Sequence, residues 1–169
     1  MFEKFGNFNS YEEINQKAAE FVAASDEQSL MELAKENGID EDDALDLMDG
    51  AITELCNPLI AAMGKILVES NDIKKLEKQE IFNDWIDYIE ARLPEDRDLQ
   101  IAVRRKDKSL IGCLGHILSW SYSHAYEINK GIVEASGIKM TGGKVKLGIP
   151  GSGTVKKLIV EYYTGKKAE

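Results

Sequence analysis

The residue types best suited to chemistry gather in one short segment. Cys113, His116 and His124 recur at spacings that place them on one face of an α-helix. A thiolate and an imidazole three residues apart can both ligate zinc if further ligands come from elsewhere in the fold. The only other cysteine, Cys56, has no partner at a zinc-ligand spacing. The pattern favours core packing of an uncharged cysteine and histidine over a metal site, so we predict no metal and no cofactor.

Cys113 and a neighbouring histidine are also the side chains of a nucleophilic pair. A reactive thiol needs an exposed and electropositive setting that lowers its pKa. The neighbours of Cys113 along the predicted helix are apolar, which favours burial of the thiol. We therefore expect no catalytic residue and a protein that is not an enzyme.

The segment GIPGSGTVKK is a second candidate. Here a glycine-rich turn leads into a predicted helix that Ser152 or Thr154 would cap, and the free N–H groups of a helix N-terminus attract anions. The nucleotide-binding pattern Gly-x4-Gly-Lys-Ser/Thr is absent, and Lys156 already lies inside the predicted helix. An ordinary turn and helix start is the favoured interpretation, with a phosphate site as the alternative.

Six carboxylates crowd into ten residues near the middle of the first half of the chain. The calcium-loop pattern is not met, because the sixth position from the first of these acids is Leu45 and not glycine. Acidic residues in a first helical turn complement the helix dipole. We predict that they form a surface that binds a basic protein partner: Asp40, Glu41, Asp42, Asp43, Asp46 and Asp49.

Basic residues cluster on either side of the central segment. If a hairpin and the last helix pack on a central helix, these side chains form one basic face able to contact the phosphates of DNA or RNA. The alternative is a solvated surface without a ligand. The predicted nucleic-acid-binding residues are Arg104, Arg105, Lys106, Lys108, Lys144, Lys146, Lys156 and Lys157, with Lys139 nearby.

The charge of the whole chain is divided along the sequence. Residues 1–100 hold 25 acidic and 9 basic side chains, a net of −16, whereas residues 101–169 hold 5 acidic and 12 basic side chains, a net of +7. Asymmetry of this size favours partners of opposite sign on the two parts, or else packing of the two parts against each other.

The element that must position these groups runs from Ser109 to Tyr126, the longest segment without an acidic or basic residue. Its apolar residues predict a helix that continues to about Ser136, apolar nearly all round in its first half and therefore buried. Its histidines, serines and glycines leave too little apolar surface for a membrane span. The stripe is Leu110, Leu114, Ile117, Ser121, Ala125, Ile128, Ile132 and Ala135.

Around this helix the sequence predicts a mainly α fold. Helix starts are expected at Ser10, at Ser25 or Asp26, at Asp40 and at Asn57–Pro58, further helices at about 75–93 and 95–106, and a small β-hairpin at 138–147 about a turn at 141–144. We expect one domain, 1–169, in two lobes: an acidic helical lobe, 1–100, and a basic lobe, 101–169, with the central helix, hairpin and last helix. Two cysteines and no signal-like N-terminus predict a cytoplasmic protein.

Four runs carry a resemblance to a known family: FGNFNSYEEINQKA, LAKENGIDEDDALDLMDG, AVRRKDKSLIGCLGHIL and LGIPGSGTVKKLIVEYYTG. In composition and residue pattern they resemble PcfK-like proteins carried by mobile elements of Gram-positive bacteria. This family includes inhibitors of the RNA-guided nuclease Cas9. The resemblance spans most of the chain but includes no catalytic signature and transfers no functional residue. It implies an anti-CRISPR protein that binds a Cas9-type nuclease or its ribonucleoprotein, or alternatively a DNA-binding or structural accessory protein of a conjugative or phage element.

Overall fold

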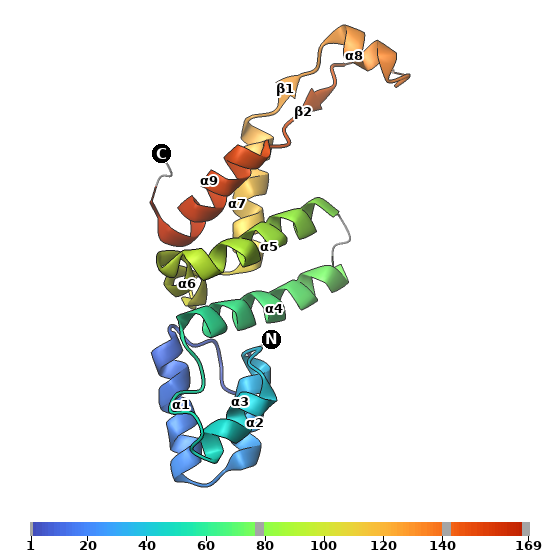
Figure 1. The fold of residues 1–169 in the computed structure, drawn as a ribbon. Coiled ribbons are helices and arrows are strands. Elements are labelled where there is room, and N and C mark those ends of the chain that lie inside the picture. The colour runs from blue at the N-terminus through green and yellow to red at the C-terminus, as the bar shows by residue number, and fades with distance from the viewer. Residues whose placement is uncertain (1, 77–79, 140–142, 167–169) are drawn as a thin grey trace.

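The computed structural model describes residues 2–76, 80–139 and 143–166 (Figure 1). The predicted mainly α fold with a small antiparallel strand pair near the C-terminus is confirmed. In chain order the elements are α1 (Tyr11–Ala23), α2 (Glu27–Glu36), α3 (Glu41–Met48), α4 (Pro58–Leu76), α5 (Glu80–Arg92), the 3-10 helix η1 (Leu93–Glu95), α6 (Arg97–Arg104), α7 (Leu110–Ser123), β1 (Tyr126–Glu127), α8 (Lys130–Ala135), β2 (Lys146–Leu147) and α9 (Ser152–Thr164).

Local capping residues fix where the helices of the first half begin. The Ser10 hydroxyl accepts a hydrogen bond from the Glu13 N–H, and Asp26 and Asp40 cap α2 and α3 in the same way. Asn57 accepts from the Ile60 N–H at 2.9 Å, directly before α4 begins at Pro58. These predicted helix starts are confirmed, because each depends only on neighbouring residues.

Two separate hydrophobic clusters hold the helices together. The first joins α1, α2 and α3 around Ile14, Leu30 and Leu33 and extends to Ala61 in the first turns of α4. The second begins at Ala62 in the same helix and gathers α5, α6, α7 and α9. Figure 1 shows α4 lying between the three-helix group below and the larger group above it. α4 therefore contributes to both cores.

A close backbone contact and a buried arginine connect the two helical groups. A Cβ on Gly64 of α4 would lie 2.2 Å from the Asn37 carbonyl oxygen, and a Cβ on Gly38, whose φ is +65°, would lie 2.4 Å from the Gly64 carbonyl oxygen. Only glycine permits this approach. Beside it, Arg104 of α6 donates to the Asn37 side-chain oxygen at 2.9 Å.

The central helix is shorter and less buried than predicted. α7 ends at Ser123, so the predicted continuation to about Ser136 is wrong, and Ala125, Ile128, Ile132 and Ala135 do not extend its stripe. Only one face is buried, through Leu110, Cys113 and Ile117, while the opposite face is open to solvent. The prediction of burial nearly all round failed because an apolar face can lie unpaired on the surface of a single chain.

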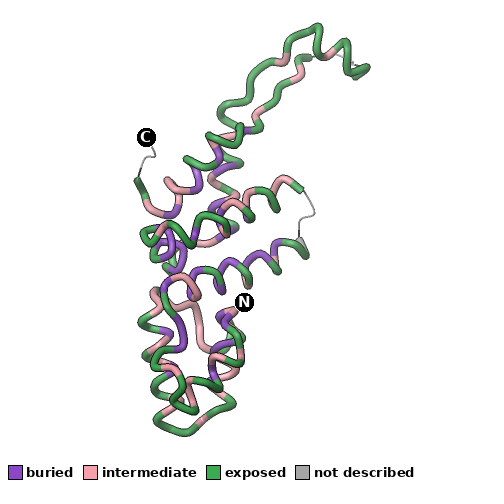
Figure 2. Tube along the Cα trace, viewed as in Figure 1, coloured by how far each residue is buried: buried purple, intermediate pink, exposed green. Residues whose placement is uncertain are grey.

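Beyond α7 the chain forms a projecting arm, described over residues 124–139 and 143–150 (Figure 1). Tyr126 pairs with Leu147 and Glu127 with Lys146, so the first strand directly follows α7 and α8 intervenes before the second. The predicted hairpin therefore has the wrong first strand, and residues 141 and 142 of its predicted turn lie outside the described residues. Figure 2 shows the arm almost entirely exposed, in contrast to the helical body.

No helix in the described part of the chain is both long enough and apolar enough to cross a membrane.

Candidate functional site

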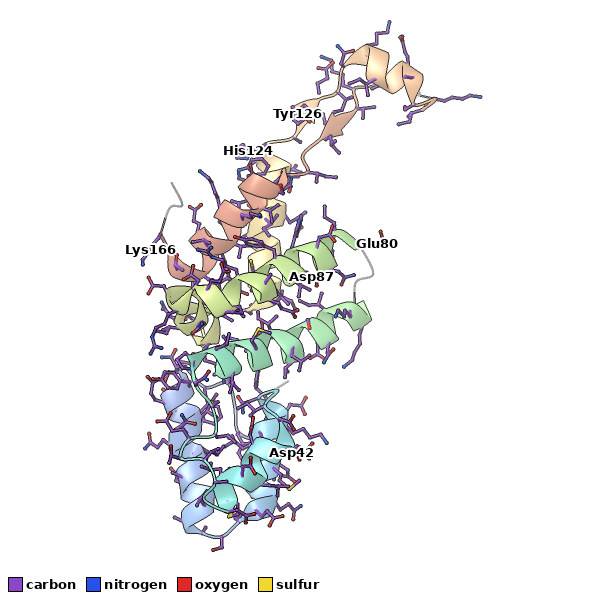
Figure 3. All side chains as sticks on the ribbon, in the orientation of Figure 1. Asp42, Glu80, Asp87, His124, Tyr126 and Lys166 are labelled. Carbon is purple, nitrogen blue, oxygen red and sulfur yellow. The ribbon has the colours of Figure 1, made fainter. Side chains whose placement is uncertain are left out.

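The predicted acidic surface lies on α3, at the end of the molecule remote from the arm. Figure 3 shows Asp42 there, with His124 and Tyr126 at the arm's base. Glu41 lies 3.7 Å from the Lys35 ammonium, and the Asp40 side chain accepts the Asp42 N–H at 3.1 Å. Among the described residues, no basic side chain forms an ion pair with Asp42, Asp43, Asp46 or Asp49. These four carboxylates therefore carry charge that no described basic side chain neutralises.

A second acidic stripe lies on α5 and was missed in the sequence. Glu80, Asp84 and Asp87 recur at steps of four and three, and all three are exposed. None of them forms an ion pair with a described basic residue. Figure 3 shows Glu80 and Asp87 along this helix, above α4. Their helical spacing could have predicted this stripe, but it is not distinctive among the 25 acidic residues of positions 1–100.

Arg104 does not belong to the basic surface. It is 2% exposed, its guanidinium donates to Asn37 and, at 3.4 Å, to the Asn7 side-chain oxygen, and its pKa is lowered by burial to about 10. The prediction of a phosphate contact there is corrected, because a guanidinium inside the fold cannot reach a phosphate outside it. The side chain instead joins α6 to the N-terminal helices.

The residues that follow Arg104 are exposed or held locally. Arg105 forms a two-point pair with Asp107 at 3.0 Å, and Lys106 is exposed. Lys108 donates to the Tyr162 carbonyl oxygen at 2.7 Å and lies over that tyrosine's ring. Lys108 therefore helps dock α9 against the start of α7, which limits its reach toward an outside ligand.

The remaining predicted lysines lie on the arm and on the first turns of α9. Lys144 pairs with Glu127 at 2.7 Å, and Lys156 lies 5.1 Å above the centre of the Tyr88 ring. Lys139, Lys146 and Lys157 are exposed. α9 packs on α7 as expected, but the arm projects away from both, so arm and body do not form the single compact basic face expected from the sequence (Figure 1).

Cys113, His116 and His124 lie in three different environments. Cys113 is fully buried and desolvation raises its thiol pKa to about 12, so the thiolate is scarce at neutral pH. His116 lies beside the Tyr162 ring, whereas His124 is exposed and stacked on Trp120 at 4.2 Å. Within the described residues, no three metal-ligating side chains gather closely enough to hold a metal ion.

The glycine-rich loop before α9 forms an ordinary helix start. Gly151 is the residue before the helix, and no side chain caps it, so the predicted cap by Ser152 or Thr154 is wrong. Both residues lie inside the first turn, where the Thr154 N–H donates to the Gly151 carbonyl oxygen at 2.9 Å.

A buried ion pair on α4 is the main polar feature that sequence reasoning missed. Lys65 donates to the carbonyl oxygens of Arg105 and Lys108, each at 2.6 Å, and its ammonium lies 3.8 Å from the Glu69 carboxylate. Glu69 accepts the Leu110 N–H at 2.6 Å, the first free donor of α7. The signal was a lysine and a glutamate four residues apart in residues 58–69, which are otherwise apolar. Together they fix the connection between α6 and α7.

Comparison with protein-family models, with curated proteins and with solved structures finds no match to this chain.

Proposed function

We propose that this protein is a non-enzymatic inhibitor of a CRISPR-Cas nuclease, acting by stoichiometric binding to the effector complex. The resemblance to PcfK-like proteins and Cas9 inhibitors suggests this class. The observation that carries the proposal is the set of α3 carboxylates, Asp42, Asp43 and Asp46, with which no described basic residue forms an ion pair. An exposed acidic helical surface of this density is complementary in charge to a basic partner.

Cas9-type nucleases offer such a counterpart, because they hold the guide–target heteroduplex in a strongly basic channel. An acidic helical surface can compete for that channel or for a basic lobe beside it. Occupancy alone then blocks target cleavage, and no reactive group is needed. Burial raises the thiol pKa of both Cys56 and Cys113 to about 12, so neither cysteine is a nucleophile at neutral pH.

The test is target cleavage by type II effector complexes in the presence of added protein. The wild type suppresses cleavage, and changing Asp42, Asp43 and Asp46 to Lys slows association and weakens inhibition, most strongly at low salt. A matched control reverses the same number of exposed acids on α5, at Glu80, Asp84 and Asp87. Full inhibition by the α3 variant would exclude that surface as the contact.

A second candidate function is a DNA-binding or structural accessory role in a conjugative element. The observation in its favour is the exposed lysines on the arm and at the start of α9, at the end of the molecule opposite α3. Failure to inhibit any of several Cas9 enzymes, together with salt-sensitive DNA binding, would favour this function over the first.

A further inference from the structure

A groove of about 280 Å³ lies between α5 and the start of α9. Most of its lining is apolar: Ile81, Trp85 and Tyr88 come from α5, and Pro150 and Val155 come from the other side. Clefts that hold drug-sized ligands have volumes of about 300 to 1,000 Å³. The groove is therefore of a size for one or two side chains of a partner and not for a large cofactor.

The aromatic wall of this groove is held in place by the fold. Trp85 and Tyr88 are half-buried and pack against the second hydrophobic cluster. The Phe82 ring meets the Trp85 ring edge to face, with 5.5 Å between the ring centres. Because these contacts fix the rings in advance, a ligand that binds on them loses little free energy in ordering the site.

The same wall already accepts one cation from within the chain. The Lys156 ammonium lies 5.1 Å from the centre of the Tyr88 ring. Among the described residues, no lysine or arginine lies over the Trp85 ring, one turn earlier on α5. Tryptophan is the aromatic side chain that attracts a cation most strongly. The groove therefore presents its better cation acceptor to an outside ligand.

The α5 side of the groove is also acidic. Asp84 lines the groove, and Glu80 and Asp87 lie one turn before and one turn after it on the same helix (Figure 3). No described basic residue forms an ion pair with any of these three carboxylates. The cation that lines the groove is Lys156, which lies over Tyr88. Charge complementarity therefore favours a cationic occupant.

The occupant must satisfy both the aromatic ring and the carboxylate. A nucleic acid would bring phosphates against the α5 carboxylates, which repel them. A purely apolar segment would cover Asp84 without giving it a partner, which costs desolvation free energy. An arginine guanidinium stacks flat on an aromatic ring and donates to a carboxylate through its fixed N–H groups, whereas a lysine ammonium is a strongly hydrated point charge. Arginine therefore fits this groove best.

We propose that the groove binds an arginine side chain presented by a basic segment of a partner protein. The guanidinium lies over the Trp85 ring and donates to the Asp84 carboxylate, while the CH₂ groups of the arginine pack on the apolar lining. This inference goes beyond the proposed function, because the groove is separate from the α3 acids and binding there needs no nuclease (Figure 3). Reversing the charges of Glu80, Asp84 and Asp87 removes this site and leaves the α3 contact in place, so the two proposals fail independently.

The experiment is an NMR titration of the full chain with the blocked peptide acetyl-Gly-Arg-Gly-amide. The chain has two tryptophans and gives two indole N–H signals, which Trp85→Phe assigns by removing one of them. The peptide is expected to shift the Trp85 signal saturably and to leave that of Trp120, whose ring is stacked on His124, in place. The matching lysine peptide is expected to bind about two- to fivefold more weakly. Comparable shifts of both indoles, or equal affinity for the two peptides, would overturn the proposal.

Two matched variants test the carboxylate. Asp84→Asn and Asp42→Asn each neutralise one exposed aspartate, the first at the groove and the second on α3. Asp84→Asn is expected to weaken binding of the arginine peptide about two- to fivefold, as for loss of an exposed ion pair, and Asp42→Asn to leave it unchanged. Circular dichroism is expected to be the same for both variants. Undiminished affinity in Asp84→Asn contradicts the pairing, and an equal loss in both variants shows attraction by net charge alone and also overturns the proposal.

Discussion

Replacing Lys65 with Met should destabilise the fold far more than replacing an exposed lysine of the same helix. The Lys65 ammonium is 1% exposed and donates to the carbonyl oxygens of Arg105 and Lys108, which then lose their donor. Methionine fills most of the space but leaves these oxygens and the Glu69 carboxylate without the charge that faces them. The fold needs this pair because it holds the connection between α6 and α7.

The size of the effect follows from burial. Breaking a buried ion pair by removing one partner costs about 3 to 5 kcal/mol, because the remaining charge stays inside the protein uncompensated. Lys75 provides the control, since it pairs with Asp72 on the same helix but is 72% exposed. Its replacement with Met should cost less than about 1 kcal/mol. Removing Lys65 and Glu69 together, as Lys65→Met with Glu69→Leu, should cost less than the sum of the single changes.

The pH dependence supplies a second test. Burial lowers the pKa of Lys65 from 10.5 to about 8, so between these values the unfolded chain holds a proton that the folded chain has released. The contribution of Lys65 to the free energy of unfolding therefore rises with pH between about 8 and 10.5. The rise is about 3 kcal/mol if no other group changes its protonation with Lys65. Tyr163 and both thiols have raised pKa values and act in the opposite direction. The informative quantity is the difference between wild type and Lys65→Met.

Urea unfolding, followed by circular dichroism from pH 7 to pH 10, measures this difference. We expect the cost of Lys65→Met to be several kcal/mol at pH 7 and to grow as the pH rises. A cost equal to that of Lys75→Met would refute the role of Lys65 in holding the connection between α6 and α7. A cost that is flat across this pH range would contradict the lowered pKa of Lys65.

Three further changes give separate tests. Gly64→Ala should lower the urea midpoint sharply, because its Cβ would lie 2.2 Å from the Asn37 carbonyl oxygen, whereas Gly115→Ala, with open space around it, should leave the monomer fold intact. Cys113→Ala should cost about 1 to 2 kcal/mol in urea unfolding through a small cavity and leave function nearly unchanged; stoichiometric zinc in the purified protein would contradict this. Lys156→Glu with Lys157→Glu should weaken DNA or RNA binding in an electrophoretic assay at low salt, and equal binding would remove α9 from the basic surface.

Much of the helical framework could be predicted from the sequence, because helix starts depend on neighbouring residues. Ser10, Asp26, Asp40 and Asn57 cap the helices that their positions indicate. Apolar periodicity located α7, but it did not distinguish a face buried within the chain from a face open to solvent. The same ambiguity extended the helix past Ser123, since Ile128 and Ile132 continue the spacing on an arm that bends away.

The sequence indicated where charged residues are dense, but not which charged residue is buried. The acidic stretch forms the helix α3, and no described basic residue pairs with its Asp42, Asp43 or Asp46. Arg104 appeared equivalent to Arg105 in sequence, yet one lies against Asn37 inside the fold and the other pairs with Asp107 outside it. Contacts between residues 37 and 104, or 69 and 110, are set by tertiary packing, which local spacing does not encode.

The central claim is that this protein acts on a CRISPR-Cas nuclease by occupancy. The most direct measurement is target cleavage by a type II effector complex, titrated with the protein at a complex concentration well above the dissociation constant. We predict that inhibition is complete at one fixed molar ratio of protein to complex, with nuclease, guide and target unchanged in mass. Complete inhibition at a small fraction of that ratio, or a change in the mass of any component, would contradict inhibition by binding; so would undiminished cleavage at a large excess of the protein.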